Sequence, residues 1–127
     1  MQKYPDLINR YWYALDWDVE QLWQLDLPTC SLPIADLDWH MDAPVWPDAQ
    51  GRGYTVTPRQ VMSRRAENAK EFARIMRADL AFPIEVYQLD RRRLILDGIH
   101  RLSKAILLGR SHIDARFVPS TAVIHQK

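Results

Sequence analysis

The sequence of 127 residues lacks features that define several large classes of protein. Cys30 is the single cysteine, so no disulfide can form within the chain. No run of about 18 apolar residues exists, which argues against a membrane-spanning helix. The first residues, Met1 to Asp6, lack the apolar segment of a secretory signal. We therefore expect a protein of the cytoplasm with no membrane partner, folded around one hydrophobic core.

Charge is divided unevenly along the chain, although the net charge is only +1. Residues 1–50 carry two basic and nine acidic residues, whereas residues 51–127 carry fifteen basic and seven acidic residues. Most of the basic residues are arginines, whose planar fork suits bidentate binding of phosphate or carboxylate. Two interpretations are open: the two halves neutralise each other in the fold, or the basic half binds an anion.

Residues 1–28 are predicted to form a tryptophan-rich helix that runs from Pro5 to about Leu25 and packs on the rest of the protein. Its apolar residues recur at helical spacing as Ile8, Trp12, Leu15, Val19 and Leu22. This stripe indicates core packing. A surface for a protein partner or for a homodimer is the alternative.

Residues 29–127 are predicted to form a single α+β domain. The expected elements are a strand (29–37), a loop (39–53), a helix (57–80), a hairpin of two strands (83–89 and 94–96), a helix (99–108) and two final strands (113–118 and 122–125). Thr57 and Gln60 form a capping box, and Gly109 suits the end of the last helix. In the predicted helix 57–80 we expect Glu71 to pair with Arg74 on the exposed side. Its buried stripe is predicted to be Met62, Ala66, Ala69, Ala73, Met76 and Leu80.

The segment with the clearest chemistry is the turn from Asp97 into the helix that follows. Gly98 allows a sharp turn and close approach of a ligand, and the free N–H groups of a helix start attract an anion. His100, Arg101 and Lys104 share one face of that helix. The pattern predicts a phosphate site.

A purely structural role for the same turn is the alternative. In that interpretation Asp97 caps the helix, and Arg101 pairs with an acid such as Asp36 or Asp38. Cys30, at the start of the predicted strand 29–37, is expected to pack as a small apolar residue.

From Thr29 to Pro119 the sequence resembles the ParB N-terminal and sulfiredoxin-like superfamily. The matching segments are residues 31–37, the helix 57–80 leading into residues 82–86, and Asp97-Gly98-Ile99-His100-Arg101 followed by Lys104-Ala105 and Gly109. Members share the order strand, helix, strand, strand, glycine turn with an arginine opening a helix, and strand. The resemblance implies a small mixed sheet with helices, to which the N-terminal helix is an addition.

In that superfamily the glycine turn and the helix start bind nucleotide phosphates: ParB proteins hydrolyse CTP, sulfiredoxin uses ATP, and a related enzyme phosphorylates serine with ADP. The positions that the resemblance assigns to phosphate or nucleotide contact are Gly98, Ile99, His100, Arg101, Thr57 and Arg59. Sulfiredoxin has its reactive cysteine where this chain has Ile99, so we do not expect reduction of sulfinic acids. The DNA-reading helices of ParB are not found in this sequence, so partition of DNA by this chain alone is not expected.

Three functions therefore stay open. The first is a small NTPase or phosphotransferase that uses ATP, ADP or CTP with Mg²⁺, with Asp36, Asp38 and His100 as catalytic candidates; the sequence has no metal-site spacing of its own. The second is a non-catalytic module in which nucleotide gates association through the tryptophan-rich helix. The third is a DNA-associated or nuclease-like protein of a plasmid or mobile element. Arg91-Arg92-Arg93 suits the third, but a solvated turn or a contact to the acidic half is favoured, because the local sequence supplies no interleaved aromatic residue.

Overall fold

The computed structural model describes residues 8–13 and 15–125. Its elements, in chain order, are η1 (Ile8–Tyr13), β1 (Leu15–Asp16), α1 (Val19–Gln24), β2 (Cys30–Pro33), η2 (Ile34–Asp36), η3 (Asp38–Asp42), α2 (Pro58–Ser63), α3 (Ala69–Arg77), β3 (Ile84–Leu89), β4 (Arg92–Asp97), α4 (Ile99–Leu107), β5 (His112–Phe117), η4 (Ser120–Ala122) and β6 (Ile124–His125). This mixture confirms the α+β class. Within the described ranges, every helix is too short or too polar to cross a membrane.

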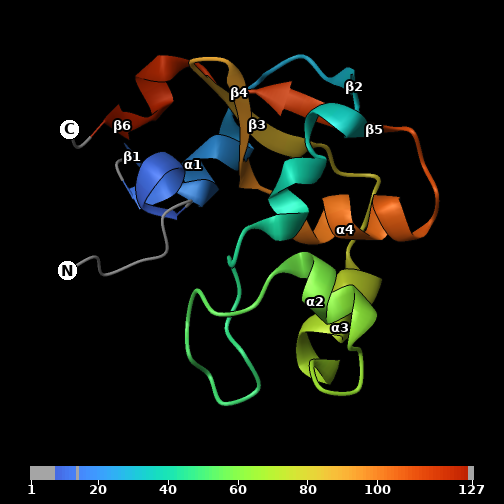
Figure 1. The fold of residues 1–127 in the computed structure, drawn as a ribbon. Coiled ribbons are helices and arrows are strands. Elements are labelled where there is room, and N and C mark those ends of the chain that lie inside the picture. Colours follow the sequence, from blue (N-terminus) through green and yellow to red (C-terminus); the bar gives the residue numbers. More distant parts are fainter. Residues whose placement is uncertain (1–7, 14, 126–127) are drawn as a thin grey trace.

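The main sheet has four strands in the order β2-β5-β3-β4. The pairs β2–β5 and β3–β4 are antiparallel, whereas β3 and β5 are parallel. The predicted hairpin is confirmed as β3 and β4. Figure 1 shows α4 on one side of this sheet, and η1 and α1 on the other.

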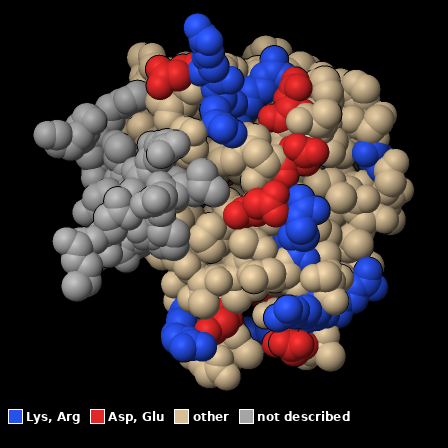
Figure 2. Space-filling model, viewed as in Figure 1, with Lys and Arg blue, Asp and Glu red and all other residues tan. Residues whose placement is uncertain are grey.

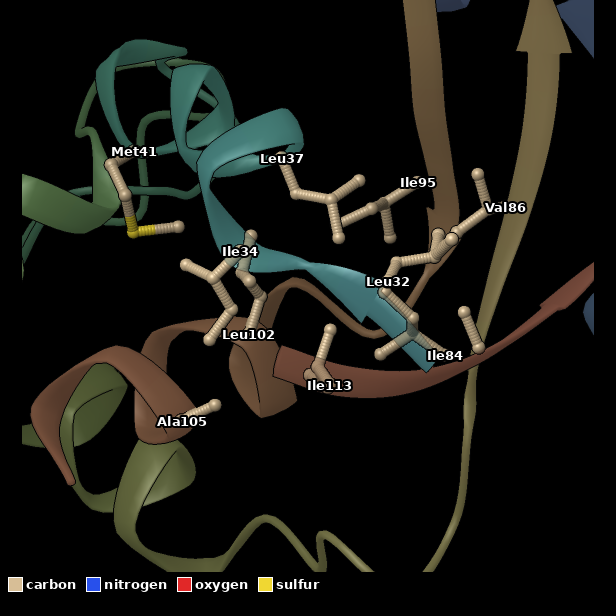
Figure 3. Close-up of a cluster of buried hydrophobic side chains, with 11 residues drawn as sticks. Leu32, Ile34, Leu37, Met41, Ile84, Val86, Ile95, Leu102, Ala105 and Ile113 are labelled. Atoms are coloured by element: carbon tan, nitrogen blue, oxygen red, sulfur yellow. The ribbon is translucent and has the colours of Figure 1, made fainter. Parts of the chain in front are cut away.

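One face of the sheet packs against α4. Ile84 and Val86 on β3 and Ile95 on β4 meet Leu102 and Ala105 of the helix (Figure 3). Together with residues from β2, η2, η3 and β5 they form the largest buried cluster of the described chain. This face therefore supports the start of α4, where the sequence predicts the site.

The opposite face packs against the two ends of the described chain. Tyr87, Leu94 and Leu96 point to this face because side chains alternate along a strand. The residues that cover them are Leu15, Leu22, Val118 and Val123. Both faces of the hairpin are therefore buried.

The N-terminal segment is not one helix. After η1 the chain pairs Leu15 and Asp16 with His125 and Ile124 as a two-stranded sheet. It then starts a new helix at Asp18, whose side chain accepts the Glu20 N–H at 3.0 Å. Pairing with a segment at the far end of the chain overrides the local helical pattern. The predicted start at Pro5 lies outside the described residues.

The predicted helix 57–80 is also two helices, α2 and α3. Thr57 caps α2 and forms the predicted capping box with Gln60. The break at residues 64–68 follows from side chains that bond backbone carbonyls: Asn68 Nδ2 donates to the Arg64 carbonyl, and Arg65 Nε donates to the Met62 carbonyl, both at 3.1 Å.

The break changes which side of each helix is buried. Val61 and Ile75 are buried, together with Glu71, whereas Ala66 and Ala69 are exposed and Met76 is 48% exposed. The prediction of a single buried stripe is therefore wrong, because the residues of α2 and α3 do not follow one continuous helical periodicity. The Glu71–Arg74 pair does form, at 3.2 Å, but its carboxylate is buried rather than on the exposed side.

The first strand is shorter than predicted. It ends at Pro33, and the chain continues in the 3₁₀-helical turns η2 and η3, so part of the predicted loop is helical. Cys30 is the first residue of β2, and it packs against the core as expected. The rest of the loop is closed by a bridge between Trp46 and Val56.

His40 is a fully buried polar side chain in this fold. Its Nδ1 lies 2.7 Å from the Leu37 carbonyl, and its Nε2 accepts the Ile95 N–H at 3.0 Å. The ring is therefore neutral, with its proton on Nδ1. Burial lowers the pKa of His40 from its ordinary value of 6.5 to about 4.

We predict that His40 makes the fold sensitive to acid. Below pH 6.5 the unfolded chain binds a proton on this ring, whereas the folded ring binds one only near pH 4. The free energy of unfolding should therefore fall as the pH drops through this window, by roughly 3 kcal/mol from this group. Urea unfolding across the window measures the loss. His40→Gln keeps an acceptor for Ile95 and should show a shallower pH dependence; an equally steep profile would contradict the assignment.

Candidate functional site

A broad pocket of about 840 Å³ lies beside the start of α4. Five elements, α1, α3, β3, β4 and β5, contribute to its walls together with α4 itself. Its charged and titratable lining residues are Arg74, Arg77, Arg101, Arg116, Asp79, Glu85, Asp97 and His100. Its rim is apolar, and includes Trp23 and Phe82, which are 59% and 64% exposed. The pocket therefore combines arginines with exposed aromatic rings.

Gly98 positions the start of α4 through close packing. Its φ of 124° favours glycine, and a Cβ there would lie 2.5 Å from Cγ2 of Ile84. The space that the missing side chain leaves is therefore filled by β3 rather than by a ligand. The predicted sharp turn is confirmed.

The helix start is left without a side-chain cap. The N-cap residue is Gly98, and among the described residues no side chain accepts a hydrogen bond from the first N–H groups of α4. The alternative in which Asp97 caps the helix is therefore wrong. Uncapped N–H groups at a helix start, which lie at the positive end of the helix dipole, suit an anion.

Arg101 is bound to the protein itself. Its guanidinium donates to the carbonyls of Phe82 and Pro83, and to Asp97 Oδ2 at 3.0 Å. The same carboxylate oxygen accepts the Trp23 Nε1–H at 2.8 Å. Arg101 therefore pairs with Asp97, not with Asp36 or Asp38, and holds the pocket wall together.

Lys104 has a similar structural role. Its Nζ donates to the carbonyls of Met76 at 3.0 Å and Ala78 at 2.7 Å, at the C-terminal end of α3. A cation is favourable there, because the last carbonyls of a helix are otherwise unpaired. The contact ties α3 to α4 beside the pocket.

Two other arginines on the pocket wall carry fewer internal contacts. Arg74 and Arg77 lie three residues apart in the last turn of α3, and both are exposed. Arg74 reaches Glu71, whereas Arg77 forms no ion pair within the described ranges. The sequence analysis missed them as site residues. Their spacing of three residues, which places both on one turn of a helix, was the signal that could have found them. The pocket could not be predicted from the sequence, because it depends on how α3 packs against α4.

His100 also lines the pocket. Its ring stacks on Trp46, with centroids 4.3 Å apart, and its Nε2 lies 3.4 Å from Glu71 Oε2. Burial lowers the pKa of His100 from its ordinary value of 6.5, and the Glu71 carboxylate opposes that effect. A neutral imidazole oriented by a carboxylate can act as a general base.

Arg116 lines the pocket and anchors α1. Its Nε donates to Glu85 Oε2 at 2.7 Å, and its two Nη groups donate to the carbonyls of Leu25 and Leu22 at 2.6 and 2.7 Å. Both members of the ion pair are largely buried. The guanidinium group of Arg116 is therefore occupied by contacts within the protein.

The other predicted site residues lie elsewhere. Asp36 pairs with Arg93 at 2.7 Å, and Asp38 begins η3. Thr57 is the cap of α2, and the exposed Arg59 pairs with Asp42 at 2.7 Å, which lowers the pKa of that carboxyl. None of these residues lines the pocket at α4.

The described residues contain no group of three or more His, Cys, Asp or Glu side chains that could hold a metal ion. A Mg²⁺ ion would therefore need oxygens of a bound phosphate as additional ligands. Asp79 is the exposed carboxylate on the pocket wall that could share it.

The two charged halves of the sequence partly neutralise each other. The pairs Arg93–Asp36 and Arg59–Asp42 each join the basic half to the acidic half. Figure 2 shows basic and acidic side chains interspersed on one face of the molecule. On this face, attraction of an anion would therefore depend on a local arrangement of cations rather than on a broad field of one sign.

No protein-family model, curated protein or solved structure matches this chain. Its family and function therefore stay predictions, argued from its own residues.

We predict that Gly98→Ala destabilises the fold by roughly 2–4 kcal/mol, because it adds a steric clash to an unfavourable φ. Gly109→Ala is the matched control: Gly109 also has a positive φ, of 75°, but open space around it. It should cost only about 1 kcal/mol. Urea unfolding of both variants measures the difference, and equal losses would show that contact with Ile84 is unimportant.

Proposed function

We propose that the chain binds a nucleotide, or another ligand with phosphate groups, in the pocket beside α4. The observation that carries this proposal is the position of Arg74 and Arg77 on the wall that also contains the uncapped start of α4. Arginine side chains and backbone N–H groups at a helix start are both good donors to phosphate oxygens. In this proposal Arg74 and Arg77 supply the positive charge that binds phosphate, and Arg101 stabilises the turn at Gly98.

The size and the rim of the pocket support a nucleotide over a bare phosphate ion. A volume of about 840 Å³ falls in the range of small-molecule sites. Trp23 and Phe82 offer exposed aromatic faces at the rim, on which a base can stack. Trp23 is oriented by its hydrogen bond to Asp97.

The fold type is part of the same proposal. From β2 to β5 the elements follow the order strand, helical segment, strand, strand, glycine turn, helix and strand. This order supports a ParB/sulfiredoxin-like domain, in which the glycine turn contacts nucleotide phosphates.

The test is a thermal-shift panel of ATP, ADP, CTP and GTP, with and without Mg²⁺. A nucleotide at about 100 times its Kd should stabilise the protein by roughly 2.7 kcal/mol and raise its Tm. The double variant R74Q/R77Q should lose this shift, because it removes the two exposed cations of the pocket wall. Arg101→Ala is a poorer test, because Arg101 also bonds the carbonyls of Phe82 and Pro83.

The matched control is R64Q/R110Q, which removes the same charge from two exposed arginines that do not line the pocket. This control should keep the full shift. The proposal fails if no nucleotide shifts the wild type, or if both double variants lose the shift equally.

A second function, phosphoryl transfer or hydrolysis, is favoured by the Glu71–His100 pair at the pocket. His100→Asn removes the base but keeps a polar side chain of similar size. It should lower phosphate release from a bound nucleotide by roughly a hundredfold and leave Kd within a few-fold of wild type. Phosphate release and binding are measured on the same samples. Unchanged release would remove His100 from the chemistry.

A further inference from the structure

The turn between β3 and β4 carries three consecutive arginines, Arg91, Arg92 and Arg93, that the pocket at α4 does not use. They line a second hollow of about 490 Å³, together with Trp39, Gln88 and Asp36. The two hollows have no lining residue in common. Asp90 makes the tight turn, with a φ of 54° that aspartate tolerates.

Arg92 is held by aromatic rings rather than by a carboxylate. Its guanidinium carbon lies 4.8 Å from the centroid of the Trp39 ring and 5.3 Å from that of Tyr11. Within the described part of the chain it forms no ion pair with Asp or Glu. Stacking uses the face of a guanidinium and leaves the N–H groups on its edge free to donate to an anion.

The aromatic support of Arg92 is rigid. Trp39 stacks on His40 with centroids 3.9 Å apart, and the His40 ring is fixed by hydrogen bonds to Leu37 and Ile95. Arg92 is therefore preorganised, which lowers the entropy cost of using it for binding.

The neighbouring arginines differ in availability. Arg93 is neutralised by Asp36, at 2.7 Å. Arg91 is exposed and forms no ion pair in the described ranges. Two cations, Arg91 and Arg92, are therefore available for an anion at the hollow.

We propose that this hollow is a second binding site, for the phosphate backbone of a single-stranded nucleic acid. Arg91 and Arg92 contact successive phosphates, and Trp39, whose ring faces are occupied by Arg92 and His40, offers its edge in the hollow to an unpaired base. Sites of this kind combine cations along the backbone with aromatic rings for bases, and tolerate different sequences. The chain itself places Trp39 and the arginines more than 50 residues apart, so only folding brings them together.

The test is fluorescence anisotropy with a labelled oligouridylate of about 20 nucleotides, and with oligothymidylate of the same length. Loss of two phosphate contacts should reduce the slope of log affinity against log salt by about 1.4. Between about 50 and about 200 mM salt, the wild type should therefore lose about sevenfold more affinity than R91Q/R92Q.

Two controls locate the effect. R64Q/R110Q removes the same charge elsewhere, and R74Q/R77Q removes the exposed cations of the pocket at α4; both should keep the wild-type salt slope. The inference is overturned if either control reduces the slope as much as R91Q/R92Q, or if neither oligonucleotide binds at low salt.

Competition experiments distinguish a nucleic acid from other ligands that carry phosphate or negative charge. Free UMP should compete weakly, since it offers one phosphate, whereas unlabelled oligonucleotide should compete fully. A duplex that binds as tightly as the single strand would overturn the role of the aromatic rings. Equal competition by polyglutamate or by vesicles rich in anionic lipid would overturn the assignment to nucleic acid.

Discussion

The β3–β4 hairpin directs apolar side chains to both faces of the sheet, so both faces must be covered by other elements of the fold. On one face Ile84, Val86 and Ile95 require α4. On the other, Tyr87 and Leu94 require segments from both ends of the described chain. The pocket lies at the end of β4, where these two coverings meet and α1, α3 and α4 approach each other without filling the space.

The fold uses most of its interior cations to satisfy backbone carbonyls. Arg116 bonds the carbonyls at the end of α1, Lys104 those at the end of α3, and Arg101 those that lead into β3. Each contact offsets the cost of burying a polar group. Arg74 and Arg77 lie outside these contacts: Arg74 pairs with the Glu71 carboxylate, and Arg77 forms no ion pair within the described ranges. They therefore matter more to the proposed function than the arginine of the glycine turn.

Local signals in the sequence were reliable where the chemistry is local. The capping box of Thr57, the hairpin, and the helix from Ile99 to Leu107, which ends before the left-handed Gly109, all follow from contacts within a few residues. The predictions of two long helices were wrong where contacts with distant or neighbouring side chains compete with the helical pattern. The helical stripe near Leu15 gives way to pairing with residue 125, and side chains at residues 65 and 68 end α2.

The α+β class and the turn at Gly98 could be predicted from the amino-acid sequence, because residue spacing and backbone freedom decide these features within one or two turns. The sequence also marked that turn as the centre of a candidate site. Which cations are occupied depends on long-range packing, since Arg116 donates to the Leu22 carbonyl 94 residues away. The tertiary structure likewise placed Trp39 beneath Arg92. Hydrogen bonds and ring contacts between distant segments depend on how the layers pack, and no local pattern contains that information.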